Sequence, residues 1–145
     1  MIFFAHPRCP CTRASVGELT WIMTRLPIKI RPHIVFFKPS NLSDDWVRTD
    51  IWRSAGALPG AIVHDDRDGF EARQFNVETS GHVLLYDPDG RLIFSGGITG
   101  SRGHLGINAG RKAVLSLLTG RSTEKKETPV FGCSLIKEKP EMGGT

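Results

Sequence analysis

The sequence is poor in cysteine and has no long apolar run. Only three of its 145 residues are cysteines, too few for the disulfide framework of a small secreted domain. No apolar stretch approaches the roughly 18 residues that suggest a membrane-spanning helix, and the N-terminus lacks the charged segment, apolar stretch and cleavage site of a signal peptide. These absences predict a chain that is soluble as given and folds around an ordinary hydrophobic core.

The sequence also has little net charge and no run of charges of one sign. Lysine and arginine together number 19 against 15 for aspartate and glutamate, which leaves a net charge of +4 spread along the chain. The sequence has no recognition helix, zinc finger or aromatic platform, so we expect no nucleic-acid partner. With 39% hydrophobic and 23% charged residues, the composition is typical of a globular protein, and the length fits one domain.

Two of the cysteines sit one residue apart, at a predicted junction between a strand and a helix. The apolar run Ile2 to Ala5 is typical of a buried strand. From Val16 onward, apolar residues recur at helical spacing, and Ser15 to Glu18 has the form of a capping box. Cys9 and Cys11 therefore lie where the strand turns into the helix.

Strands and helices alternate along the rest of the chain until a hairpin breaks the alternation. Cap and turn residues delimit a strand at 34–37, a helix from Ser43 to Gly56, a strand at 61–63, a short helix at 70–75, hairpin strands at 82–86 and 92–95, and a last helix from Asn108 to Gly120. This order predicts an α/β fold whose central mixed sheet combines parallel strands with a C-terminal antiparallel hairpin and is flanked by helices.

The chain is expected to divide into a domain and a tail. The domain covers residues 1–120, and residues 121–145 form a polar C-terminal tail that carries Cys133 and has one apolar anchor at 130–136. Because the sequence begins directly in an apolar strand, we expect that an upstream strand or anchor is missing.

Two segments carry a family resemblance. Residues 4–15, with the letters FAHPRCPCTRAS, join the first strand to the first helix, and residues 96–104, GGITGSRGH, follow the hairpin. With the predicted order of elements, they make the chain similar to the thioredoxin-like superfamily, most closely to its RedB-type and TlpA-like thiol-disulfide proteins. The resemblance implies a thioredoxin-like fold, thiol-disulfide oxidoreductase activity, an extracytoplasmic location with a lost or absent N-terminal anchor, and a membrane-bound electron donor among the partners.

The cysteine motif departs from the family pattern. Thioredoxins separate their two cysteines by two residues and carry a proline before the second one. Pro10 and Cys11 match that proline and that cysteine, which places Arg8 at the family's nucleophile and Cys9 at a position that is normally not reactive. The family also carries a cis-proline that faces the disulfide, and the corresponding segment 79–81 has no proline. The resemblance therefore carries Cys11 over directly and implies a different handling of the substrate.

Cys9 and Cys11 are the predicted catalytic residues. The thiolate is the reactive form of cysteine, and a helix N-terminus stabilises it, which favours Cys9 as the attacking thiol if the helix begins near Pro10. With one residue between them, Cys9 and Cys11 can bond only through a tight ring, and such a disulfide is easily reduced. The alternative is that one of them pairs with Cys133, brought in by the tail as a resolving thiol.

Further side chains are candidates for auxiliary roles at this site. Three lie close to the cysteines in sequence, and two belong to the loop after the hairpin, which is expected to border the cysteines because the strand at 92–95 runs back toward them. These candidates are His6, Arg8, Arg13, Arg102 and His104.

A non-catalytic metal module is the alternative function. His6, Cys9, Cys11 and Cys133 are the types of ligand that copper(I) and zinc prefer, although the paired spacing of a structural zinc site is absent. An interaction domain without activity is a third reading. The leading prediction remains a thiol-disulfide oxidoreductase that needs no cofactor and acts on protein or small-molecule thiols and disulfides. The sequence leaves the oligomeric state unknown.

Overall fold

A computed structural model describes residues 1–26 and 30–135 of the chain. Its elements follow the predicted alternation and are, in chain order, β1 (Ile2–Ala5), α1 (Pro10–Thr24), β2 (His33–Lys38), the 3-10 helix η1 (Asp44–Trp46), α2 (Asp50–Gly56), β3 (Ile62–Arg67), α3 (Phe70–Gln74), β4 (His82–Tyr86), β5 (Leu92–Gly96) and α4 (Ala109–Leu118). None of the helices in this described part of the chain is long and apolar enough to cross a membrane.

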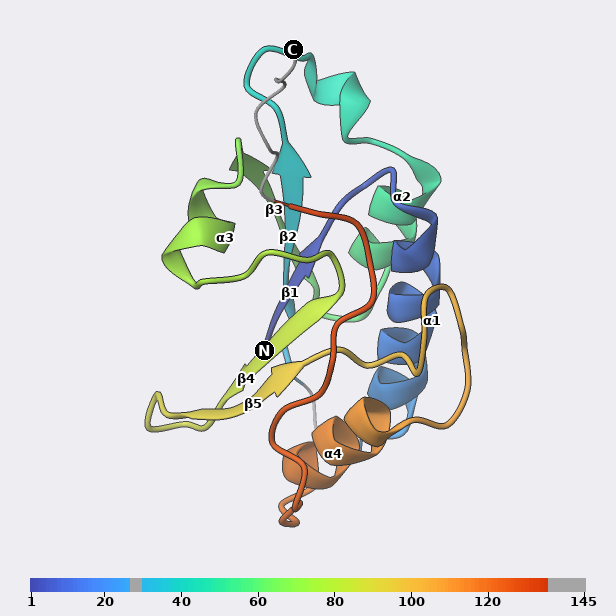
Figure 1. The fold of residues 1–145 in the computed structure, drawn as a ribbon, viewed down its shortest axis with the longest axis vertical. Coiled ribbons are helices and arrows are strands. Elements are labelled where there is room, and N and C mark those ends of the chain that lie inside the picture. Colours follow the sequence, from blue (N-terminus) through green and yellow to red (C-terminus); the bar gives the residue numbers. More distant parts are fainter. Residues whose placement is uncertain (27–29, 136–145) are drawn as a thin grey trace.

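The strands form one mixed sheet in the order β3-β2-β1-β4-β5. Strand β1 lies in the middle, parallel to β2 and antiparallel to β4. Strand β3 continues the parallel side, and β5 completes the antiparallel hairpin. Figure 1 shows α1, α2 and α4 on one face of this sheet and α3 on the other. The predicted α/β architecture, parallel strands plus a C-terminal hairpin flanked by helices, is confirmed.

Each face of the sheet carries its own hydrophobic core, because successive side chains of a strand point to opposite faces. Phe3 and Phe36 belong to the larger core, beneath α1, α2 and α4. Phe4 and Phe37 belong to the smaller core, beside α3, and Leu135 of the C-terminal segment is also part of it. The tail therefore contributes to the interior of the protein.

Helix α1 begins earlier than its predicted cap. Its first residue is Pro10 and its N-cap is Cys9, in keeping with the preference of proline for the first helical position. The predicted capping box from Ser15 to Glu18 is wrong, because both residues lie inside the helix. Glu18 is instead fully buried and accepts a hydrogen bond of 3.0 Å from Arg111 of α4.

The single helix predicted from Ser43 to Gly56 is also wrong, since η1 and α2 are separate. Thr49 is the N-cap of α2, and its Oγ1 accepts a hydrogen bond from the backbone N–H of Trp52 at 3.3 Å. The same hydroxyl donates to the carbonyl oxygen of Pro7 at 2.6 Å. The break at Thr49 thus ties α2 to the loop that leads into α1.

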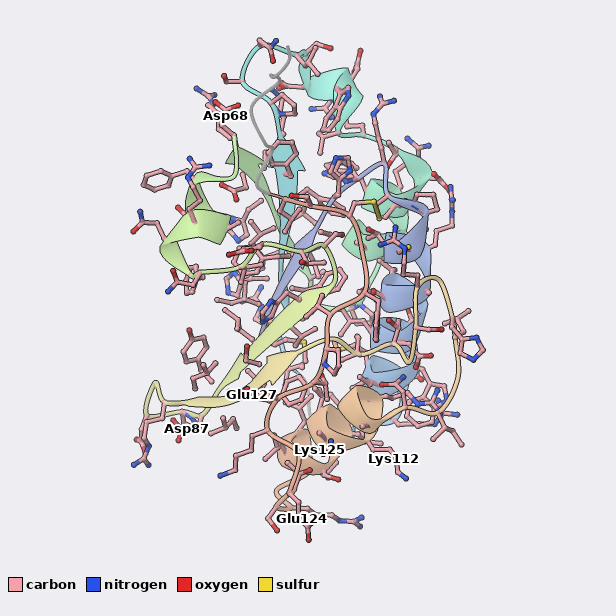
Figure 2. The ribbon with its side chains drawn as sticks, viewed as in Figure 1. Asp68, Asp87, Lys112, Glu124, Lys125 and Glu127 are labelled. Carbon is pink, nitrogen blue, oxygen red and sulfur yellow. A yellow bond between two sulfur atoms is a disulfide. The ribbon has the colours of Figure 1, made fainter. Side chains whose placement is uncertain are left out.

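The C-terminal segment from residue 121 to residue 135 returns from the end of α4 across the hairpin side of the sheet (Figure 1). Glu127 forms a parallel bridge with Ser95 of β5, and Ser134 forms an antiparallel bridge with Thr79, just before β4. Figure 2 shows Glu127 beside β5. The predicted anchor at 130–136 contributes the buried Leu135, while residue 136 lies outside the described residues. The segment is therefore fixed to the sheet at both of these bridges.

Candidate functional site

A disulfide joins Cys9 to Cys133, although the two residues are 124 positions apart in the sequence. Their Cα atoms are 6.0 Å apart. The side chain of Cys9 is buried at the N-cap of α1, and Cys133 is half-buried on the C-terminal segment. Cys11 is free and buried. Of the two pairings that the sequence leaves open, the structure contains the one between Cys9 and Cys133.

The geometry of α1 explains why Cys11 is not the partner of Cys9. Cys11 is the second residue of the helix, two positions after the N-cap. Side chains two residues apart on a helix do not face each other. A bond between Cys9 and Cys11 would require the first turn of α1 to open.

A closed ring of hydrogen bonds joins His6 and Thr12, at the start of α1, to Ser80, just before β4. The backbone N–H of His6 donates to Oγ of Ser80 at 2.8 Å, and the hydroxyl of Thr12 donates to the carbonyl oxygen of His6 at 3.1 Å. The hydroxyls of Thr12 and Ser80 are 2.8 Å apart. Because each hydroxyl has one hydrogen, Ser80 must be the donor in this last bond. The ring holds the start of α1 against the segment that precedes β4.

The same segment holds the main chain around Cys133. The backbone N–H of Ser80 donates to the carbonyl oxygen of Cys133 at 2.8 Å, and the N–H of Leu135 donates to the carbonyl oxygen of Glu78 at 2.8 Å. These two bonds are those of a short antiparallel strand pair. Cys133 is therefore presented to Cys9 by its backbone.

Arg102, from the loop after β5, reaches the same segment, whereas His104 does not. Nη1 of Arg102 donates to the carbonyl oxygen of Gly132 at 2.9 Å. His104 is exposed, and its backbone N–H donates to Ser101. Within the described ranges, no hydrogen bond or ion pair joins its side chain to a cysteine. The loop thus borders the site through Arg102.

His6 is placed at the site as a neutral group. Burial, and next the charge of Arg8, lower its pKa below the ordinary value of 6.5. Its Nδ1 accepts the backbone N–H of Arg8 at 3.1 Å, so the ring proton is on Nε2. The ring stacks on Phe37 with centroids 5.6 Å apart. His6 therefore contributes no positive charge for a thiolate near neutral pH.

The two arginines next to the cysteines have partners on the neighbouring helices. Nε of Arg8 donates to the carbonyl oxygen of Trp46 at 3.0 Å, and its guanidinium carbon lies 5.0 Å from the centroid of the Trp46 ring. Arg13 pairs with Asp50 at 2.6 Å, and this hydrogen bond is the main cause that lowers the pKa of Asp50. Both arginines are bound to η1 or α2 beside the first turn of α1.

Comparison with known proteins defines the fold and not the activity. No family model and no curated protein matches this chain. A crystal structure of an uncharacterized conserved protein from Geobacillus kaustophilus matches with a TM-score of 0.72 and 21% identity, over 96% of this chain and 76% of that one. A hypothetical protein from Sinorhizobium meliloti 1021 matches with a TM-score of 0.63 and 19% identity, over 95% of this chain and 79% of that one. These matches support the mixed-sheet α/β fold described above, which is consistent with a thioredoxin-like fold.

The site contains two residues that the sequence analysis did not single out. Ser80 lies in the segment where the sequence analysis noted only the missing proline, and Thr12 directly follows Cys11. Both side chains are almost fully buried, at 1% exposure. A hydroxyl residue immediately after the cysteine motif, and a second one in place of the expected proline, were the available signals.

The proposed metal ligands do not form a ligand set in this structure. Cys9 and Cys133 are bonded to each other, and a metal binds cysteine as the free thiolate. Over residues 1–26 and 30–135, no group of three or more His, Cys, Asp and Glu side chains is placed to hold a metal ion. A copper or zinc site at His6, Cys9, Cys11 and Cys133 stays a prediction that concerns the reduced protein.

Proposed function

We propose that this protein is a thiol-disulfide oxidoreductase whose working pair is Cys9 and Cys133. One observation carries the proposal. The disulfide joins the N-cap of a 15-residue helix to a half-buried cysteine on a segment that is held by backbone hydrogen bonds and by the burial of Leu135. A cysteine at a helix N-terminus is a good leaving group and a good nucleophile, because the helix stabilises its thiolate.

The oxidised protein would accept two electrons from a dithiol. A substrate thiolate attacks the sulfur of Cys133, a new bond forms between these two sulfurs, and Cys9 leaves with the electron pair as a thiolate. The second thiolate of the substrate then attacks the substrate sulfur of the mixed disulfide, which closes the substrate disulfide and releases Cys133 as a thiolate. The substrate dithiol is oxidised, the protein disulfide is reduced, and the two substrate protons pass to the protein thiols or to water.

The reduced protein would catalyse the opposite reaction by a separate route, in which Cys9 and not Cys133 forms the mixed disulfide and the second substrate sulfur leaves as a thiolate when that disulfide is resolved. The Cys9 thiolate attacks a substrate disulfide, one substrate sulfur leaves as a thiolate, and Cys133 resolves the mixed disulfide by attacking the sulfur of Cys9. Cys133 is a better placed resolving thiol than Cys11, because Cys11 lies inside the first turn of α1. Cys11 would act only in a state in which that turn has opened.

The resemblance to RedB-type and TlpA-like proteins supports the same activity. It also extends the proposal to an extracytoplasmic location and to a membrane-bound electron donor. Protein or small-molecule thiols and disulfides are the partners that the chemistry requires.

The test is a redox titration of the native protein in glutathione buffers, with thiol trapping and mass spectrometry. Wild-type protein is expected to show one reversible two-electron couple that joins Cys9 to Cys133. The couple should vanish in Cys9→Ser and in Cys133→Ser, and persist in the matched control Cys11→Ser. Catalytic turnover of a model disulfide should follow the same pattern, although Cys9 of Cys133→Ser should still form a mixed disulfide in a single step.

A structural cross-link is the competing interpretation. It would be established by a Cys9–Cys133 bond that resists reduction under all glutathione ratios until the protein unfolds. In that case the proposed function is wrong, and the disulfide serves only to hold the C-terminal segment.

A further inference from the structure

The segment around Cys133 is bound in a way that any extended peptide could imitate. Two hydrogen bonds hold its main chain: the N–H of Ser80 donates to the Cys133 carbonyl, and the N–H of Leu135 donates to the Glu78 carbonyl. Arg102 donates to the Gly132 carbonyl. Main-chain pairing gives affinity to an added strand, and pockets for alternate side chains give it selectivity.

The residue before the cysteine is restricted to glycine by space. A Cβ added at Gly132 would overlap the carbonyl oxygen of Ser80. The φ angle of Gly132 lies outside the left-handed region, so the backbone itself would accept any residue. The Ser80 carbonyl is held in place by the pairing of Ser80 with Cys133 and by the hydrogen-bond ring behind it. It therefore cannot yield easily to a larger side chain.

The second residue after the cysteine enters an apolar pocket. Leu135 is 2% exposed and packs in the smaller core with Phe4 and Phe37. Between them, Ser134 is exposed. The occupied site thus selects glycine before the cysteine, tolerates a polar residue after it, and takes a large aliphatic side chain at the next position.

We infer that the C-terminal segment occupies the protein's substrate site, and that the substrates are polypeptides with the pattern Gly-Cys-x-Leu in an extended conformation. The inference rests on the proposed function and specifies its substrate class. In the reduced protein, such a peptide replaces residues 132–135 at the edge formed by residues 78–80. Its cysteine is then positioned for the Cys9 thiolate as Cys133 is.

The test uses the full-length Cys133→Ser protein and a peptide disulfide. The probe is Val-Phe-Gly-Cys-Ser-Leu with its cysteine linked to 2-thiopyridine. The Cys9 thiolate attacks the peptide sulfur, the bond between protein and peptide forms, and pyridine-2-thione leaves with the electron pair and is read by its absorbance. Two further peptides replace the glycine by alanine or the leucine by serine, and a third replaces the serine by threonine as a matched control.

The peptide with the protein's own sequence, Val-Phe-Gly-Cys-Ser-Leu, and the threonine control are expected to react at similar rates. The alanine peptide and the serine-for-leucine peptide should each react at least about tenfold more slowly, because overpacking or lost burial of this size costs one or more factors of ten. The protein's own segment competes equally with all four peptides and does not alter these ratios. The double variant Cys9→Ser, Cys133→Ser measures the background from Cys11.

Glutathione linked to 2-thiopyridine is the control that distinguishes a wrong substrate site from a wrong proposed function. If Cys9 reacts with this small disulfide while all four peptides react equally, the substrate site is wrong and the oxidoreductase stands. If Cys9 reacts with no disulfide, the proposed function fails and the inference fails with it. Should Cys133→Ser not fold, Cys133→Ala takes the same four peptides and the same rate measurement.

Discussion

The two faces of the sheet are built in different ways. The larger core is covered by α1, α2 and α4, and its side chains, such as the fully buried Leu19, come from regular elements. The smaller core is covered by α3, which has five residues, and by Leu135, which lies two residues beyond a disulfide cysteine. The Cys9–Cys133 disulfide is therefore two residues away from a side chain that belongs to the smaller core.

This difference suggests how the protein could undergo disulfide exchange without unfolding. Reduction removes the covalent link that holds residue 133, while the larger core keeps all of its contacts. Near residue 133 the segment is then held by the backbone hydrogen bonds at Glu78 and Ser80, by Arg102 and by the burial of Leu135, while its earlier part stays paired with Ser95 of β5. Such locally weak elements are where proteins open for function.

The largest expected effect tests the comparison directly with two leucine truncations. Leu19→Ala should lower the free energy of unfolding by roughly 3–5 kcal/mol, and Leu135→Ala by roughly 2–3 kcal/mol in the oxidised protein. On reduction, the cost of Leu19→Ala should stay the same, whereas the cost of Leu135→Ala should shrink, because the segment then detaches part of the time. Denaturant unfolding with and without reductant measures all four values.

An equal cost of Leu135→Ala in both redox states would contradict the comparison. It would mean that the segment stays docked without its disulfide. Hydrogen exchange of the Leu135 amide, which is bonded to Glu78, gives an independent reading of the same opening.

A smaller effect is expected from the hydrogen-bond ring that joins the two regions. Ser80→Ala leaves the N–H of His6 without an acceptor and the oxygen of Thr12 without its donor. Leaving buried polar groups unpaired costs roughly 1–3 kcal/mol, and the loss should also slow exchange with disulfides because the ring fixes residue 80, whose backbone N–H positions Cys133. The exposed Ser101→Ala is the matched control and should change stability by less than about 0.5 kcal/mol. Equal effects of Ser80→Ala and Ser101→Ala on stability and on disulfide exchange would show that the hydrogen-bond ring stabilises neither region.

The sequence predicted the elements well and their long-range contacts poorly. Periodicity and cap residues placed the strands and most helices, and Asn108 caps α4 through the backbone N–H of Arg111 as expected. The capping box failed because Ser15 and Glu18 fit a local pattern, while the use of Glu18 is decided by its buried partner Arg111. No local rule contains that contact.

The site shows the same limit. The pattern at Cys9 and Cys11 identified the end of the molecule where the disulfide lies, because two cysteines at a helix start are a local signal. The bond to Cys133 depends on the path of the C-terminal segment, which in turn depends on Leu135 and on the acceptors at residues 78–80. Sequence spacing alone favours a bond between neighbouring cysteines. It does not predict the path that brings a distant cysteine to the same place.

The smallest expected effect is a pH dependence from His6, whose ring stacks on Phe37 of the smaller core. The pKa of His6 is lowered in the folded protein, so the unfolded chain binds the proton first as the pH falls below about 6.5. Stability from this group is thus complete above that pH and is lost as the pH falls toward the folded pKa. His6→Gln should flatten the fall in unfolding free energy measured over this range, while the exposed His104→Gln should not. An unchanged slope in His6→Gln would assign the pH dependence to other buried groups, beginning with His82, whose pKa burial also lowers, and would move the titrating group from the site to the hairpin.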